Sequence, residues 1–198
     1  MDMSLIVFFV IIGVVALYII AIFNRLVALK HRFKNAFATI EVQLKRRYEL
    51  IPNLVEIAKG YLKHERETLD AVISARNAAA KGLSQAHSDP GNPDAIKGLS
   101  QAEGKLAGAL GSLNVVMEAY PDLKGNQNMM QLSEEMTTTE NKVAFARQAF
   151  NDAVMEYNVY KQSFPQTIFA ATFGHGKDAE LLEFEDSAKF QDAPKVSF

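Results

Sequence analysis

The sequence contains no cysteine and no tryptophan, and it holds only 11 glycines and 6 prolines among 198 residues. The absence of cysteine excludes disulfides, thiol nucleophiles and cysteine-ligated metal clusters, although it does not decide the compartment. Because residues that break helices are few, the composition favours long helices over sheets. A net charge of −2 gives no indication of nucleic acid as a partner. We therefore expect an all-α protein with no nucleic-acid partner.

Charged residues are missing altogether from one stretch near the N-terminus, residues 4–23. About 20 apolar residues at about 1.5 Å each cover the roughly 30 Å hydrocarbon core of a bilayer, which predicts one transmembrane helix. A cleaved signal peptide would need a basic leader, whereas no Lys or Arg precedes this run, so we expect the anchor to be retained. The side chains expected to contact lipid are Leu5, Ile6, Val7, Phe8, Phe9, Val10, Ile11, Ile12, Val14, Val15, Leu17, Ile19, Ile20, Ile22 and Phe23.

Basic residues follow this stretch at Arg25, Lys30, Arg32 and Lys34. The positive-inside rule places the domain after the span in the cytoplasm, with the periplasm as the alternative because the N-terminal tail is too short for much contrast. The same cations are candidates for binding anionic lipid headgroups, at about 1 kcal/mol each near such a surface. The sequence leaves open whether they bind headgroups or only set the topology.

A helical bundle domain is expected over residues 24–165, after a short tail at 1–3 and the span. Its first helix continues from the span as one rod up to Pro52, where a kink or short break is expected because proline lacks a backbone donor. Residues 77–94 are predicted to form the main loop, since Gly82 ends the periodic pattern and turn-forming residues follow it.

A third helix is predicted to begin after the cap residue Asn92 and to run to about Tyr120. It carries a row of small residues at Gly104, Gly108 and Gly111. A glycine inside a helix costs about 1 kcal/mol relative to alanine, so the close approach of a neighbouring helix is expected to offset that cost. This glycine face is the candidate interface between copies of the chain.

The clearest helical periodicity lies between Met129 and Phe164, where apolar residues recur at steps of three and four over five heptads. Such a pattern favours coiled-coil-like packing along a helical partner at a shallow crossing angle. Spacing alone leaves open whether that partner is internal or another subunit. The internal option is the default, because three other amphipathic helices are available within the chain.

Residues 166–198 are expected to form a C-terminal tail. A short apolar patch at Ile168, Phe169 and Phe173 must dock on the bundle or on the membrane. Further along, three aromatic residues are candidate points of contact with a protein partner: Phe184, Phe190 and Phe198.

No catalytic, cofactor or metal site is expected. A di-iron bundle needs Glu-x-x-His pairs, and no glutamate is followed by histidine three residues later. The sequence also lacks a phosphate-binding glycine loop and a nucleophile elbow, so the chain is expected not to be an enzyme. The histidines show no metal-ligand spacing and are expected at the surface or at helix ends: His31, His64, His87 and His175.

A second basic cluster, residues 45–47, lies too far along a rigid rod to touch the same membrane as the first cluster. We expect its side chains to form ion pairs within the bundle or between subunits. The candidate acidic partners are Glu134, Glu135 and Glu140.

Three blocks of sequence, residues 45–69, 119–128 and 150–165, form a recognisable set. They read KRRYELIPNLVEIAKGYLKHERETL, AYPDLKGNQN, and FNDAVMEYN leading into SFP. In this order, and with the anchor ahead of them, they resemble the LemA family of bacterial membrane proteins. The chain departs at His175, where an aromatic residue is expected after Gly174, and its tail is longer than expected.

The resemblance implies an N-terminal anchor followed by a long antiparallel bundle of the four-helix type, and it implies no known reaction. Some relatives are linked to building or shaping bacterial membranes, including those of magnetosomes. The leading hypothesis is a non-enzymatic scaffold that is anchored in the bacterial inner membrane and self-associates. The alternative is an adaptor or sensor in envelope stress, acting through a protein partner that docks on the C-terminal tail.

Overall fold

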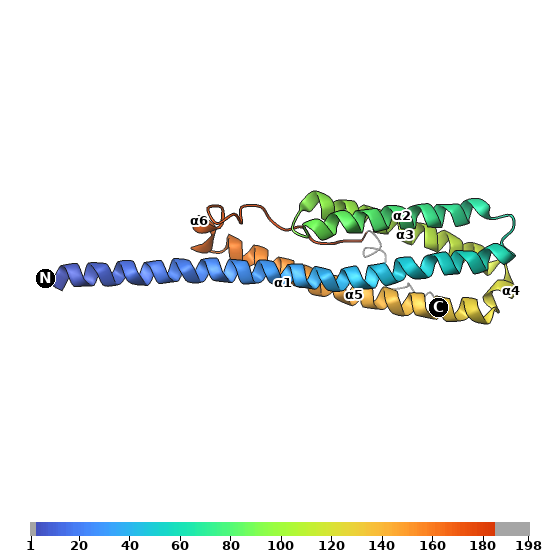
Figure 1. Ribbon diagram of the computed structural model, residues 1–198, viewed down its shortest axis with the longest axis horizontal. Helices are drawn as coiled ribbons and strands as arrows, with labels where there is room; N and C mark the ends of the chain where they lie inside the picture. Colours follow the sequence, from blue (N-terminus) through green and yellow to red (C-terminus); the bar gives the residue numbers. More distant parts are fainter. Residues whose placement is uncertain (1–2, 185–198) are drawn as a thin grey trace, which may run out of the picture.

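The computed structural model describes residues 3–184, and Figure 1 shows a helical bundle from which one much longer helix projects. The described residues contain no strand, which confirms the predicted all-α class. Residues 185–198, with the predicted contact points Phe190 and Phe198, lie outside the described part of the chain. The helices are α1 (Met3–Tyr61), α2 (Arg66–Ser88), α3 (Pro93–Glu118), α4 (Pro121–Lys124), α5 (Gln127–Gln162) and α6 (Gln166–Ala170).

Helix α1 is continuous over 59 residues, so the anchor and the first helix of the domain form one rod, as predicted. The break expected at Pro52 is wrong, because this proline lies inside the helix. An internal proline costs about 3 kcal/mol. The neighbouring side chains of Ile51 and Val55 are fully buried, and burial of such side chains contributes about 1.5–3 kcal/mol each, which offsets the lost hydrogen bond.

Helix α5 runs antiparallel to α1 and packs along it, so the predicted helical partner is internal (Figure 1). Phe150 of α5 meets two phenylalanines of α1 edge-on, with ring centroids 6.3 Å from Phe33 and 5.6 Å from Phe37. The end of the predicted pattern is wrong, because α5 stops at Gln162 and the side chain of Phe164 is 81% exposed.

Helices α2 and α3 form a hairpin that packs on the distal part of α1. The loop predicted at residues 77–94 is wrong, because α2 continues to Ser88 and leaves only a short turn before Asn92. Gly82 does not end the helix. A Cβ atom at this position would lie 3.3 Å from Cα of Leu99, so the glycine allows α2 and α3 to approach closely. Asn92 caps α3 as predicted, accepting bonds from the N–H groups of residues 94 and 95.

Candidate functional site

The predicted anchor is the part of α1 that projects beyond the bundle (Figure 1). Its apolar side chains are exposed over most of its length, Phe9 for example at 63%. Its last turns differ, because Ile19 is half-buried and Ile22 is packed in the domain core. Within residues 3–184, α1 is the one helix that is long and apolar enough to cross a membrane. The anchor therefore enters the domain without a hinge.

Two of the four cations that are candidates for headgroup binding also form ion pairs within the domain. Arg25 donates to one oxygen of Glu156 on α5 at 2.8 Å, and Arg32 pairs with the other oxygen of the same carboxylate. All three side chains are partly exposed, so this pairing adds little to stability. The pairing has a geometric consequence, because it holds the C-terminal part of α5 beside the segment of α1 that follows the anchor.

The other two predicted cations, Lys30 and Lys34, line a groove of about 350 Å³ at the membrane-proximal end of the bundle. Phe23 and Phe173 form part of its wall. Lys34 lies 4.0 Å from Asp89, at the limit of an ion pair. The groove thus combines aromatic side chains next to the span with ammonium groups farther from it, which suits the headgroup end of an anionic lipid.

His175 is buried at the same end of the bundle, so the expectation that every histidine lies at the surface or at a helix end is wrong for this residue. Its Nδ1 atom forms a hydrogen bond with the hydroxyl of Tyr157 at 2.8 Å. Burial lowers the pKa of His175, and the charges of Lys30 and Lys161 lower it further. The imidazole that replaces the expected aromatic residue therefore supports the turn after α6 in its neutral form.

The apolar patch predicted after α5 divides between the bundle and the surface. Phe169 and Phe173 stack on each other at 6.1 Å, and Phe173 also meets Phe23 of α1 edge-on at 5.3 Å. Ile168, by contrast, is 59% exposed, and Phe164 is exposed beside it in sequence. Phe169 and Phe173 of the patch therefore dock α6 on the anchor, whereas Ile168 faces outward.

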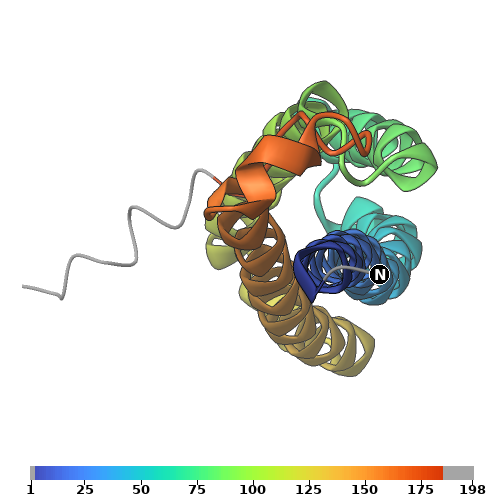
Figure 2. The ribbon, with the colours of Figure 1, turned by 90° about the vertical axis from the view of Figure 1, so that its left-hand side faces the viewer.

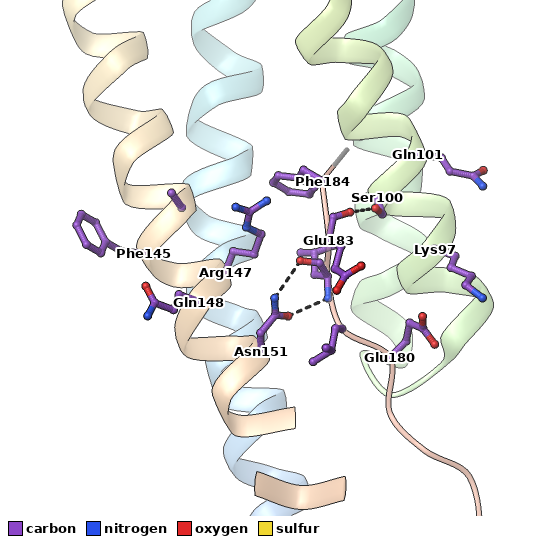
Figure 3. Close-up of a pocket in the computed structure, with 13 residues that line it drawn as sticks. Lys97, Ser100, Gln101, Phe145, Arg147, Gln148, Asn151, Glu180, Glu183 and Phe184 are labelled. Atoms are coloured by element: carbon purple, nitrogen blue, oxygen red, sulfur yellow. Dashed lines mark hydrogen bonds between the residues drawn. The ribbon is translucent and has the colours of Figure 1, made fainter. Parts of the chain in front are cut away.

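After α6 the chain returns along the bundle as an extended segment, residues 179–184, which we call the strap. Among residues 3–184, α3 and α5 do not pack directly on each other, and Figure 3 shows the strap lying between them. The groove around the strap measures about 860 Å³. The strap therefore closes the side of the bundle that the helices leave open.

Two asparagines of α5 hold the strap by its backbone, and Figure 3 shows one of them, Asn151. The side-chain amide of Asn158 bonds the C=O and the N–H of Ala179 at 2.8 and 3.0 Å. Asn151 bonds the same two groups of Leu182 at 3.1 and 2.9 Å. Seven residues of helix rise about 10.5 Å, and three residues of extended chain span about 10 Å, so the two registers match. Ser100 of α3 completes the attachment by donating to the C=O of Glu183.

A buried polar cluster joins α1 to α3 in the middle of the bundle. Glu103 accepts a hydrogen bond from the hydroxyl of Tyr48 and lies 3.2 Å from the guanidinium of Arg47. Arg76 of α2 donates to the backbone C=O of Tyr48 at 2.9 Å, which adds the third helix. Burial raises the pKa of Glu103, while Arg47 and the hydroxyl of Tyr48 oppose that shift.

Sequence reasoning missed this cluster, although a signal was present. Glu103 falls between Leu99 and Leu106 on the apolar face of α3, where a charged residue interrupts the hydrophobic spacing. Arg47 interrupts the apolar face of α1 in the same way. The ion pair within the bundle that was predicted for the second basic cluster is confirmed at Arg46, the residue before Arg47, which bonds Glu135 at 2.7 Å.

Two of the three glycines on the predicted glycine face of α3 have no tight contact with the described residues. Gly108 and Gly111 are exposed, and among the described residues no neighbouring atom lies within 4 Å of a Cβ built on either one. Gly104 is half-buried. Val115, one helical turn beyond Gly111 on the same face, is 69% exposed. Within residues 3–184 no neighbouring helix therefore accounts for Gly108 or Gly111, and an interface between copies stays a prediction.

The fold and its membrane-proximal end define a class of protein, in which one N-terminal helix is both candidate membrane span and core element of a helical bundle. A sequence model of the LemA family matches residues 36–198. The chain belongs to the LemA family, which confirms the resemblance.

Three curated proteins are similar to the chain over most of its length. The chain is 27% identical over 168 residues to Protein LemA of Metamycoplasma hominis, which covers 85% of this chain and 68% of that protein. It is 22% identical over 179 residues to Magnetosome protein MamQ 2 of Paramagnetospirillum magneticum, covering 81% and 64%. Identity to Magnetosome protein MamQ of Magnetospirillum gryphiswaldense is 25% over 170 residues, covering 77% and 61%. The chain thus spans less than two thirds of either magnetosome protein, and none of these names is that of an enzyme.

Proposed function

We propose that this protein is a non-enzymatic scaffold, anchored in the bacterial inner membrane, that self-associates and thereby organises or shapes the membrane. The observation that carries the proposal is the continuity of α1 from Met3 to Tyr61. A helix of this kind transmits position without a hinge, so the bundle would be held at a fixed orientation to the bilayer. The names of the magnetosome relatives support a role at membranes.

The buried polar groups support architecture rather than chemistry. Glu103 is engaged by Arg47 and Tyr48, and Lys161 forms an ion pair with Asp178. Side chains tied to each other inside the bundle orient helices and are not poised for a substrate. We infer no catalytic role and no cofactor for this chain.

We propose that Lys30 and Lys34 bind anionic headgroups while Arg25 and Arg32 serve the contact with α5. The bundle would lie in the cytoplasm, following the positive-inside rule. Because the chain has no cysteine, one thiol introduced at the exposed Glu118 reports the side directly. Labelling of Glu118→Cys by a membrane-impermeant maleimide in intact spheroplasts, without lysis, would contradict a cytoplasmic bundle.

Self-association through the glycine face of α3 is tested by cross-linking in native membranes. Val115→Cys places a thiol on that face, and Val42→Cys places one on an exposed position of α1 as the matched control. Oxidation should convert Val115→Cys to a covalent dimer and leave Val42→Cys as a monomer. Equal dimer yields from the two variants would mean random collision and would contradict the proposed interface.

The adaptor or sensor alternative keeps one supporting observation, because the strap shows that the groove between α3 and α5 accepts an extended peptide. The two functions separate when residues 185–198 are deleted and the strap is left in place. An adaptor that binds its partner through the tail would lose the partner, whereas the proposed scaffold would keep its oligomer.

A further inference from the structure

Two exposed apolar residues, Phe164 and Ile168, lie at the end of the bundle from which the anchor emerges. Figures 1 and 2 show α6 at this end, where it also contacts α1. Phe164 and Ile168 are both large, apolar and exposed there. Their neighbours Phe169 and Phe173 are turned inward, so the segment has one face on the bundle and one face outside.

The sequence around these side chains is unusual for a protein surface. Residues 163–176 contain no Asp, Glu, Lys or Arg, in a chain of which such residues make up 22%. The one titratable side chain in this stretch, His175, is buried against Tyr157 and has a lowered pKa. A surface that carries large apolar groups and no charge is suited to the boundary of a bilayer rather than to water.

The level of the segment along the membrane normal follows from the packing of α5 on α1. Arg25 and Arg32 bracket Glu156, which fixes the register of the two antiparallel helices. Six residues along α5 from Glu156 to its last residue, Gln162, rise about 9 Å, and an equal rise back along α1 from the level of the two arginines reaches the last turn of the anchor. The edge-on contact of Phe23 with Phe173 places α6 at the same level.

We propose that residues 163–176, with α6 at their centre, form a second membrane contact in which Phe164 and Ile168 enter the lipid interface beside the span. The inference rests on the anchoring of α1 in a bilayer and adds to it. One helix could rotate and tilt freely in lipid, whereas a helix with an apolar contact at its side has a preferred tilt and azimuth. The occupant of the patch is therefore the lipid bilayer itself.

Tryptophan fluorescence tests this contact cleanly, because the natural chain contains no tryptophan. Phe164→Trp and Ile168→Trp are made in the full-length chain and reconstituted in phospholipid vesicles. Phe145→Trp is the matched control in water, since Phe145 is 74% exposed and lies about 25 Å along α5 from the end of that helix at Gln162. Phe9→Trp is the matched control in lipid.

Lipids brominated on their acyl chains and aqueous iodide are used as quenchers. The expected result is that Phe164→Trp and Ile168→Trp lose emission to brominated lipid and resist iodide, as Phe9→Trp does. Phe145→Trp should show the reverse. If the two α6-segment variants behave like Phe145→Trp, the segment lies in water and the proposal is overturned.

Two further outcomes have distinct meanings. Protection of Phe164→Trp from iodide without quenching by brominated lipid would show that protein, such as a second copy, covers the patch, and this also overturns the proposal. Loss of lipid quenching at Phe9→Trp as well would show that α1 itself is not in the bilayer. That last result would overturn the anchoring together with the contact that rests on it.

Discussion

The guanidinium of Arg47 on α1 lies 3.2 Å from the carboxylate of Glu103 on α3, and the two side chains are only 6% and 1% exposed. Their helices make no direct backbone-level packing contact, so this pair and the Tyr48 hydroxyl form a polar link between α1 and α3. Desolvation of two charges costs several kcal/mol each, and the attraction between them roughly repays that cost. The cluster therefore fixes the position of the α2–α3 hairpin on α1, and its net contribution to stability is small.

Removing one member of this pair should be strongly destabilising. Glu103→Ala leaves the guanidinium of Arg47 buried without a counter-charge, and we expect the free energy of unfolding to fall by about 3–5 kcal/mol. Denaturant unfolding of the full-length protein in detergent, followed by circular dichroism, measures the loss. Glu135→Ala removes the exposed partner of Arg46 and should cost no more than about 1 kcal/mol.

The double variant Arg47→Met with Glu103→Leu serves as the second control. It removes both charges together and should recover most of the stability lost in Glu103→Ala. A loss in Glu103→Ala as small as that in Glu135→Ala would contradict the account of the cluster.

The strap should depend on the two asparagines that hold its backbone. Asn151→Ala removes both bonds to Leu182 and leaves its N–H without a partner, at a cost of about 1–3 kcal/mol. Hydrogen exchange should then show loss of protection at the Leu182 amide, while the Phe150 region of α5 keeps its protection. The exposed neighbour Gln148 lines the same groove, and Gln148→Ala should leave exchange at Leu182 unchanged. Unaltered protection in Asn151→Ala would mean that the strap is held by other contacts.

Features set by local chemistry were predicted from the sequence. The uncharged run at residues 4–23 indicated the projecting part of α1, and Asn92 indicated the start of α3 through its capping side chain. The heptad pattern that includes Phe150 indicated the packing of α5. Each of these signals lies within a few turns of the chain, where periodicity and propensity act directly.

Features set by contacts between distant residues were missed. Gly82 resembles a helix terminator until the backbone of Leu99 is placed against it. Asn151 resembles a surface polar residue until Leu182, 31 residues later, returns beside it. Phe164 continues the heptad spacing, but its helix has already ended. For Gly82 and Asn151 the role depends on a residue that is distant in the sequence, and the sequence alone does not show that the two meet.

The turn after α6, which His175 supports, should become less stable when the pH falls below the ordinary pKa of histidine. The pKa of His175 is lowered from 6.5 by burial and by Lys30 and Lys161, so near neutral pH the folded state holds the ring neutral. As the pH drops through 6.5, the unfolded chain takes up a proton that the folded chain excludes, and stability decreases until the folded pKa is passed. Asp178, with a pKa lowered by Lys161, loses its contribution only below its ordinary value of 3.8.

The comparison of His175→Asn with the natural chain isolates this effect. Melting temperatures measured at about pH 7.5 and about pH 5 should differ less in the variant, because it has no imidazole to protonate. The pKa of Tyr157 is raised by burial and by Asp178, so the tyrosine stays protonated over this range and does not contribute to the difference. An equal drop in both proteins would contradict the assigned role of His175.

A bulky side chain on the glycine face should block assembly without harming the fold. Gly108→Leu projects into open space in the single chain, and the better helix propensity of leucine should stabilise α3 by up to about 1 kcal/mol. Gly98→Leu is the matched control, because Gly98 is also exposed on α3 but lies on a different side of the helix. We expect loss of the oligomer in Gly108→Leu alone, with melting temperatures at or above that of the natural chain. Loss of the oligomer in both variants, or in neither, would contradict an interface on the glycine face.

The mass of the intact protein in mild detergent tests the proposed scaffold most directly. Light scattering after gel filtration, over a wide range of protein concentration, separates the mass of the protein from that of the bound detergent. The account predicts a defined multiple of the protomer mass that persists on dilution. A protein that remains a single protomer at every concentration would contradict it.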